Sequence, residues 1–109
     1  MDDEGFGSDN PKDGMYELGC VRLIISGKVQ KVGYRNWLKN ICMQKKVTGW
    51  VRNRSDGTVE AMLYANKSRI SDVVNQCYVG PSAASVKKIK EYPGGNTDNA
   101  PKEFSIALS

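Results

Sequence analysis

The sequence has 109 residues, 39% of them hydrophobic, which suits one small globular domain and leaves no room for a second hydrophobic core. It contains no histidine, so catalysis by an imidazole and zinc sites with histidine ligands are excluded. Its 16 lysines and arginines exceed its 12 aspartates and glutamates, and no apolar run approaches the ~20 residues that a membrane span needs.

Charge is distributed unevenly along the chain. Residues 1–18 contain six acidic residues and one lysine, a net charge of −5, together with three glycines and one proline. This composition is typical of a flexible segment. Residues 19–109 contain 15 basic and six acidic residues, a net charge of +9. We therefore predict an acidic flexible N-terminal arm over residues 1–18 and one basic domain over residues 19–109, which favours an anionic partner.

The first half of this domain predicts a strand, a helix and a hairpin. Residues 21–26 alternate in polarity as a strand does, and a loop bounded by glycines follows over residues 27–33. Apolar residues then recur at helical spacing and predict a helix over residues 34–46. Residues 47–53 and 58–65 predict two strands, and the Asp-Gly pair between them indicates a hairpin.

The second half predicts a helix and two further strands. The helix covers residues 68–79 and is ended by a Gly-Pro pair. In the strand over residues 85–92, two apolar residues lie three positions apart, which indicates a bulge. Apolar residues alternate again over residues 104–108. The order β-α-β-β-α-β with a terminal β predicts an α+β fold, the ferredoxin-like α/β sandwich, in which two helices cover one face of an antiparallel sheet.

The loop before the first helix is the leading candidate for a binding site. A strand, a loop with glycines and a helix N-terminus present several backbone N–H groups to one anion. Arg35 lies in the first turn of that helix, where its guanidinium can hold two phosphate oxygens. Cysteine phosphatases place a cysteine six positions before such an arginine, but Val29 stands there. A strand, loop and helix with two glycines and an arginine occur often by chance, so on these residues alone an ordinary connection with Arg35 in solvent is the favoured interpretation.

Two longer motifs carry a family resemblance. Residues 27–35 read Gly-Lys-Val-Gln-Lys-Val-Gly-Tyr-Arg, and residues 49–60 read Gly-Trp-Val-Arg-Asn-Arg-Ser-Asp-Gly-Thr-Val-Glu. Both resemble motifs of the acylphosphatase family, in the family's order and spacing, within residues 19–109. The resemblance implies hydrolysis of the carboxyl–phosphate bond of acyl phosphates to a carboxylate and inorganic phosphate, without a metal or another cofactor.

The resemblance also implies roles for single residues. Arg35 corresponds to the family's phosphate-binding arginine and Asn53 to its water-orienting asparagine. The chemistry suits a chain without histidine, because a carboxylate leaves without protonation and a loose phosphoryl-transfer transition state needs positioning and charge stabilisation rather than a strong base. The substrate-binding loop is expected to comprise Gly27, Lys28, Val29, Gln30, Lys31, Val32, Gly33 and Tyr34.

One residue departs from the family pattern and keeps an alternative open. Lys31 stands where the family usually has glycine, and a lysine would be strained by ~1 kcal/mol if that position needs a positive φ. A catalytically weak acylphosphatase-like binding module is therefore an alternative. A nucleic-acid-binding module of the same fold is another, but residues 58–65 contain one aromatic residue and an acid where an RNA recognition motif is rich in aromatics. Nucleic acid is therefore not expected as a partner.

The cysteines and the N-terminal residues predict the compartment. Cys20, Cys42 and Cys77 form no Cys-x-x-Cys pair, so we expect three reduced thiols, packed mostly as small hydrophobic side chains. The first residues show neither a basic region nor an apolar stretch typical of a secretory signal. We therefore expect a cytoplasmic protein. The resemblance implies a small acyl phosphate as substrate partner and inorganic phosphate as product, and we expect a monomer with no membrane association.

Overall fold

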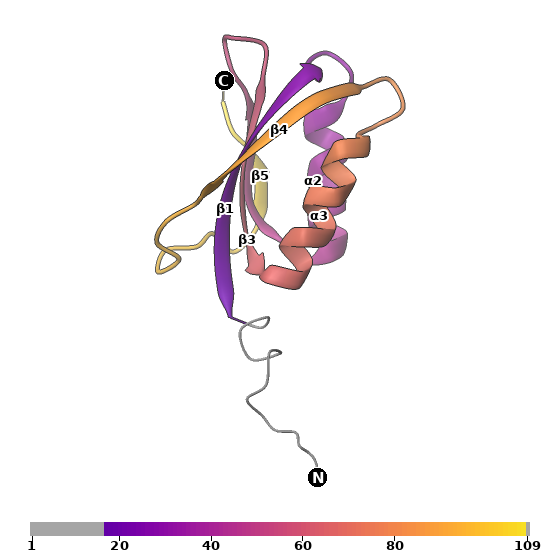
Figure 1. Cartoon of the computed structure of the whole chain (residues 1–109). Helices are drawn as coiled ribbons and strands as arrows, with labels where there is room; N and C mark the ends of the chain where they lie inside the picture. The colour runs from indigo at the N-terminus through magenta and orange to yellow at the C-terminus, as the bar shows by residue number, and fades with distance from the viewer. Residues whose placement is uncertain (1–16, 109) are drawn as a thin grey trace.

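A computed structural model describes residues 17–108. Nearly all of the predicted acidic arm, residues 1–16, lies outside the described residues. The described part has a five-stranded sheet with two helices on one face (Figure 1), which confirms the predicted fold class. The elements in chain order are β1 (Leu18–Lys28), α2 (Tyr34–Lys45), β2 (Thr48–Asn53), β3 (Val59–Asn66), α3 (Lys67–Val79), β4 (Ser85–Pro93) and β5 (Phe104–Ile106).

The sheet is mixed, whereas an antiparallel sheet was predicted. Its strand order is β4-β1-β3-β2-β5, and β5 pairs in parallel with β2, with Phe104 opposite Gly49. The reason lies in the connection after β4. Strand β4 ends at the end of the sheet where β2 begins, and the following loop stays at that end, so β5 starts beside the start of β2 and runs in the same direction (Figure 1).

The core lies between the sheet and the two helices. Alternate residues of the three central strands meet apolar residues of α2 and α3, because successive side chains of a strand point to opposite faces. Cys42 and Cys77 are fully buried there, as predicted for small hydrophobic side chains. The fully inaccessible residues are Leu23, Ile25, Leu38, Cys42, Val51, Val59, Ala61, Leu63, Val73 and Cys77. This packing fixes α2, and with it the loop at its N-terminus, relative to the end of β2.

The predicted bulge is present in β4. Ser26 pairs with Lys88 while Gly27 pairs with Val86, so Lys87 is the extra residue. Gly27 has a φ of 124°, and a β-carbon there would collide with the carbonyl oxygen of Ser85. Only glycine allows this close approach of the two backbones, which sets the point where the chain leaves β1 for the loop. Within residues 17–108, neither helix is long and apolar enough to span a bilayer.

Candidate active site

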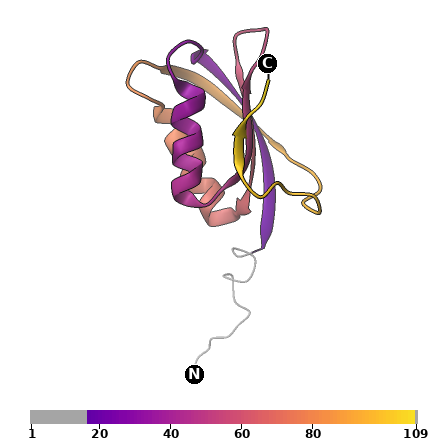
Figure 2. The ribbon, with the colours of Figure 1, turned by 180° about the vertical axis from the view of Figure 1, so that it is seen from behind.

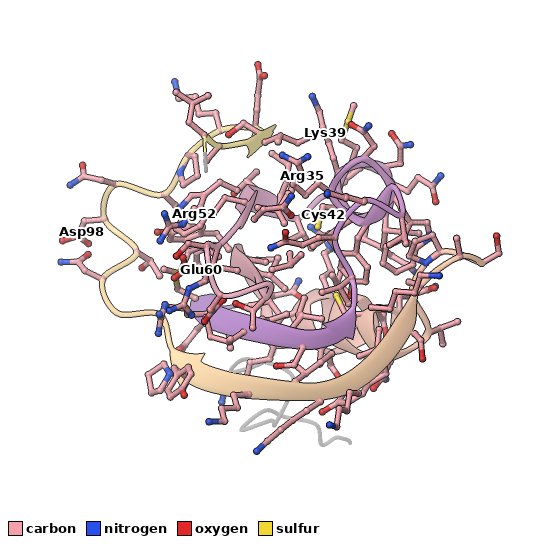
Figure 3. All side chains as sticks on the ribbon, turned by 90° about the horizontal axis from the view of Figure 1, so that it is seen from above. Arg35, Lys39, Cys42, Arg52, Glu60 and Asp98 are labelled. Carbon is pink, nitrogen blue, oxygen red and sulfur yellow. The ribbon has the colours of Figure 1, made fainter. Side chains whose placement is uncertain are left out.

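A small cavity lies where β1 ends and α2 begins, at the upper end of the molecule in Figure 1. Its volume is about 160 Å³. The lining residues are Val29, Lys31, Gly33, Tyr34, Arg35, Asn36, Asn53 and Ile106. The fold therefore brings Arg35 and Asn53, which come from α2 and β2, to one cavity. Figure 3, which looks onto this end of the molecule, places Arg35 at the side of α2 toward β5.

The loop between β1 and α2 supplies backbone donors to this cavity. Lys31 has a φ of 62° and Gly33 a φ of 78°. Left-handed residues in a short loop turn successive N–H groups toward a common concavity that suits an anion. No hydrogen bond formed among residues 17–108 uses the backbone N–H of residues 30–33. These donors are available to a ligand.

Positive charge at the start of α2 is not neutralised within the described chain. Gly33, which precedes the helix, makes no side-chain cap, and the first turn contains no acidic residue. The unpaired N–H groups of a helix N-terminus carry a partial positive charge. Arg35 adds a full charge, and within residues 17–108 no carboxylate lies within 4.0 Å of its guanidinium. The cavity thus combines a cation and a helix end, both suited to phosphate oxygens.

Asn53 contributes a polar atom of the opposite kind. It is the last residue of β2 and pairs with Val59 of β3, which fixes its backbone. Its side-chain oxygen Oδ1 is buried, and no donor within the described chain hydrogen-bonds to it. A buried amide oxygen without a partner is energetically costly. Asn53 therefore has an unused hydrogen-bond acceptor and is a lining residue of the cavity.

Gln30 connects the loop between β1 and α2 to the turn after Asn53. Its Nε2 donates to the carbonyl oxygens of Arg54 at 2.8 Å and Thr58 at 2.9 Å. The turn is stabilised further by Asp56, whose carboxylate accepts from the hydroxyl and the N–H of Thr58. The hydroxyl's hydrogen bond is the main cause of the lowered pKa of Asp56. The Gln30 side chain thereby holds the two halves of the site together.

Tyr34, the last residue of the predicted substrate-binding loop, attaches the first helix to the second. The Tyr34 hydroxyl donates to the carbonyl oxygen of Cys77 at 2.7 Å, and burial raises the pKa of this hydroxyl well above its ordinary value. Its ring also packs against Trp37, with centroids 5.2 Å apart. The Tyr34 side chain therefore anchors α2 to α3.

Four residues of the predicted substrate-binding loop do not line the cavity: Gly27, Lys28, Gln30 and Val32.

Comparison with known proteins identifies the family. Residues 21–106 match the family model described as Acylphosphatase. The chain belongs to the acylphosphatase family. It is 40% identical over 87 residues to an acylphosphatase of Alcanivorax borkumensis, covering 80% of this chain and 95% of that protein. It is 41% identical over 87 residues to an acylphosphatase of Rhizobium etli, covering 80% of this chain and 92% of that protein.

Solved acylphosphatase structures share the fold. The acylphosphatase from Bacillus subtilis superposes with a TM-score of 0.78 at 28% identity, covering 84% of this chain and 99% of that one. The acylphosphatase from Coxiella burnetii gives a TM-score of 0.77 at 27% identity, covering 83% of this chain and 93% of that one. The chain is thus an enzyme of the acylphosphatase class, and its substrates are acyl phosphates as a class.

Two cavity residues of this acylphosphatase were not expected from the sequence. Asn36 directly follows Arg35 in the first turn of α2, and this helical position is a signal that could have found it. Ile106 comes from β5, and the parallel pairing that brings it beside Val51, two residues before Asn53, has no local signal in the sequence. Among residues 17–108, no cluster of three or more histidine, cysteine, aspartate or glutamate side chains could hold a metal ion.

Proposed function

We propose that this acylphosphatase holds the phosphate group of its substrate on the loop over residues 27–35 and on Arg35, and that Asn53 orients the attacking water. One observation carries the proposal: two residues with unused polar groups, within the described chain, line the same cavity. They are Arg35, whose guanidinium has no carboxylate partner, and Asn53, whose buried amide oxygen has no donor. The first fits the phosphate oxygens and the second fits a water hydrogen.

The reaction follows from these contacts. The N–H groups of the loop, the N-terminus of α2 and Arg35 bind the non-bridging phosphate oxygens and stabilise their charge in the transition state. The Asn53 oxygen accepts a hydrogen bond from a water molecule and holds its lone pair toward phosphorus. The bond from water oxygen to phosphorus forms as the bond from phosphorus to the acyl oxygen breaks. The acyl group leaves as a carboxylate, and the water's protons pass to phosphate and solvent.

The decisive variant is Arg35→Lys. Lysine keeps the charge but loses the planar pair of donors, so we expect kcat/KM for benzoyl phosphate, measured with EDTA present, to fall by about a hundredfold or more. Arg69→Lys, at an exposed arginine on α3, is the matched control and should leave turnover unchanged. Urea unfolding of both variants verifies the fold. An Arg35→Lys protein that retains half the wild-type turnover would contradict the assignment.

The same assay tests the alternative of a binding module. Wild-type protein that binds inorganic phosphate but does not hydrolyse benzoyl phosphate would favour a binding module, and Lys31 would then be the first residue to replace with glycine.

We infer a cytoplasmic monomer as the working state. The three unbonded thiols support a reducing compartment, since oxidising compartments favour disulfides.

A further inference from the structure

The cavity at Arg35 is too small for a whole acyl phosphate. Its volume of about 160 Å³ is close to the ~150 Å³ of an engineered protein cavity that holds one benzene molecule. A phosphate group with one attacking water has about as many non-hydrogen atoms as benzene and accounts for a space of that size. On the proposed function, the acyl group must therefore extend out of the cavity over a neighbouring surface.

A larger groove lies farther along α2 and is lined by residues of this helix and of the segment that enters β5. Its volume is about 560 Å³. Its lining includes apolar side chains and three lysines. We call it the α2–β5 groove and define it by Lys39, Cys42, Met43, Lys46, Lys102 and Phe104.

Helix and strand geometry place the nearest residues of the groove about one helical turn from the cavity. Arg35 and Lys39 lie one turn apart on the same face of α2, separated by about 6 Å along the helix axis. Ile106 and Phe104 lie on the same face of β5, about 7 Å apart. The first residue of each pair lines the cavity and the second lines the groove. Helix α2 and strand β5 are in contact and lie side by side in Figure 2.

The charge of the groove selects a particular kind of acyl group. Its lining includes three lysines and one acid, Glu103. Within residues 17–108, no carboxylate lies within 4.0 Å of the Lys39 ammonium. Lys39 is half-buried and comes from the side of α2 toward β5 (Figure 3). Phe104 is buried, while Met43 is 60% exposed.

We propose that the α2–β5 groove binds the acyl group of the substrate and that Lys39 determines specificity for acyl phosphates with a second anionic group. The phosphate lies at Arg35, an apolar spacer crosses Phe104, and the second anion pairs with Lys39. The spacing of about one helical turn suits a spacer the length of a benzene ring or a short methylene chain. Lys46 and Lys102, farther along the groove, extend the preference to longer acyl groups.

The test uses three rigid substrates that differ only at the far end of the acyl group: benzoyl phosphate, 4-carboxybenzoyl phosphate and the methyl ester of the latter. We expect wild-type protein to prefer the carboxylate over its neutral ester by about three- to fivefold in kcat/KM, the range of a partly exposed ion pair. Lys39→Gln should abolish this preference and leave benzoyl phosphate hydrolysis within about twofold of wild type, as expected of a side chain outside the reacting centre. Lys90→Gln, an exposed charge on β4 at the opposite edge of the sheet, should retain the preference.

The matching acylphosphonates separate this inference from the proposed function, because they bind without being hydrolysed. A carboxylate preference in phosphonate binding that Lys39→Gln removes supports the groove, even in a protein that hydrolyses none of the three substrates. A preference that survives Lys39→Gln, or an equal loss with all three substrates, overturns it. Equal loss of the preference in Lys39→Gln and Lys90→Gln also overturns it, because the effect would then come from net charge rather than from the groove.

Discussion

Lys31 is the residue in which backbone conformation and charge act in opposite directions. Its φ of 62° lies in the left-handed region, as the glycine of the family motif predicts. A residue with a β-carbon pays ~1–2 kcal/mol there, and a glycine loses roughly 0.5–1 kcal/mol more chain entropy on folding. At the same time Lys31 lines the cavity at Arg35 and adds a cation to it.

We therefore expect Lys31→Gly to raise the free energy of unfolding by about 0.5–1 kcal/mol and to raise KM for benzoyl phosphate. Lys46, whose φ is 59°, offers a matched control for the stability effect alone. Lys46→Gly should raise the free energy of unfolding similarly. Urea unfolding and steady-state kinetics on both variants measure the two effects. A lower free energy of unfolding in Lys31→Gly would contradict the backbone strain inferred at Lys31.

Asn53 is the residue whose role is kinetic rather than one of binding. Its side-chain oxygen is proposed to hold water, so Asn53→Ala removes an interaction with the nucleophile and none with the phosphate. We expect kcat to fall by about a hundredfold, while the inhibition constant of inorganic phosphate changes little. Asn40→Ala, at an exposed position on α2, is the control for replacing an amide. Equal losses in kcat and phosphate affinity would place Asn53 in the phosphate site.

At the scale of elements, one buried carboxylate joins three strands on the face of the sheet away from the helices. Glu60 of β3 accepts hydrogen bonds from Arg22 of β1 at 2.6 Å and from Arg52 of β2 at 2.7 Å. The two guanidiniums also lie over aromatic rings, Arg22 over Tyr92 and Arg52 over Trp50. Burial disfavours the charged form of Glu60, but the two arginines outweigh it and lower its pKa.

Glu60→Gln should lower the free energy of unfolding at pH 7 by about 1–2 kcal/mol. This is less than for a fully buried pair, because the Arg22 and Arg52 side chains are 35% and 41% exposed. A pKa lowered on folding gives stability that is present above the unfolded pKa and is lost as the pH falls through the folded pKa. The difference between wild type and Glu60→Gln should therefore shrink below the ordinary glutamate pKa of 4.5. Urea unfolding at pH 7 and pH 3 measures it, with the exposed Glu91→Gln as control, and a gap that widens in acid would refute the ion-pair explanation.

The elements also separate what local sequence predicts from what it does not. The Asp-Gly turn, the two helices and the bulge in β4 depend on residues close together in the chain, and all were predicted. The parallel pairing of β5 with β2 depends on the path of a loop that carries no pairing signal. The same distinction holds for the site. The motifs around Arg35 and Asn53 are visible in the sequence. The position of Ile106 at the cavity and the hydrogen bond of the Gln30 amide depend on the tertiary structure and could not be predicted.

On the scale of the whole molecule, the cavity is a place of unneutralised positive charge in a basic domain. The domain over residues 19–109 carries +9, and its site combines Arg35, Lys31 and the uncapped N-terminus of α2. Like charges in one place disfavour the folded state, and a cation in the first turn opposes the helix dipole. An anion at the site relieves both effects, so binding and folding should be coupled.

Inorganic phosphate should therefore stabilise the protein in proportion to its occupancy of the site. A ligand that binds only the folded state adds about 2.7 kcal/mol to the free energy of unfolding at a concentration of 100 Kd. Phosphate also stabilises proteins generally by exclusion from their surface, so the informative quantity is the difference between variants. Arg35→Lys should lose most of the increment, and Arg69→Lys should keep it, in urea unfolding at matched ionic strength with sodium chloride as reference. If phosphate stabilised both variants equally, the anion would act through the solvent, and Arg35 would not be the residue that couples phosphate binding to the fold.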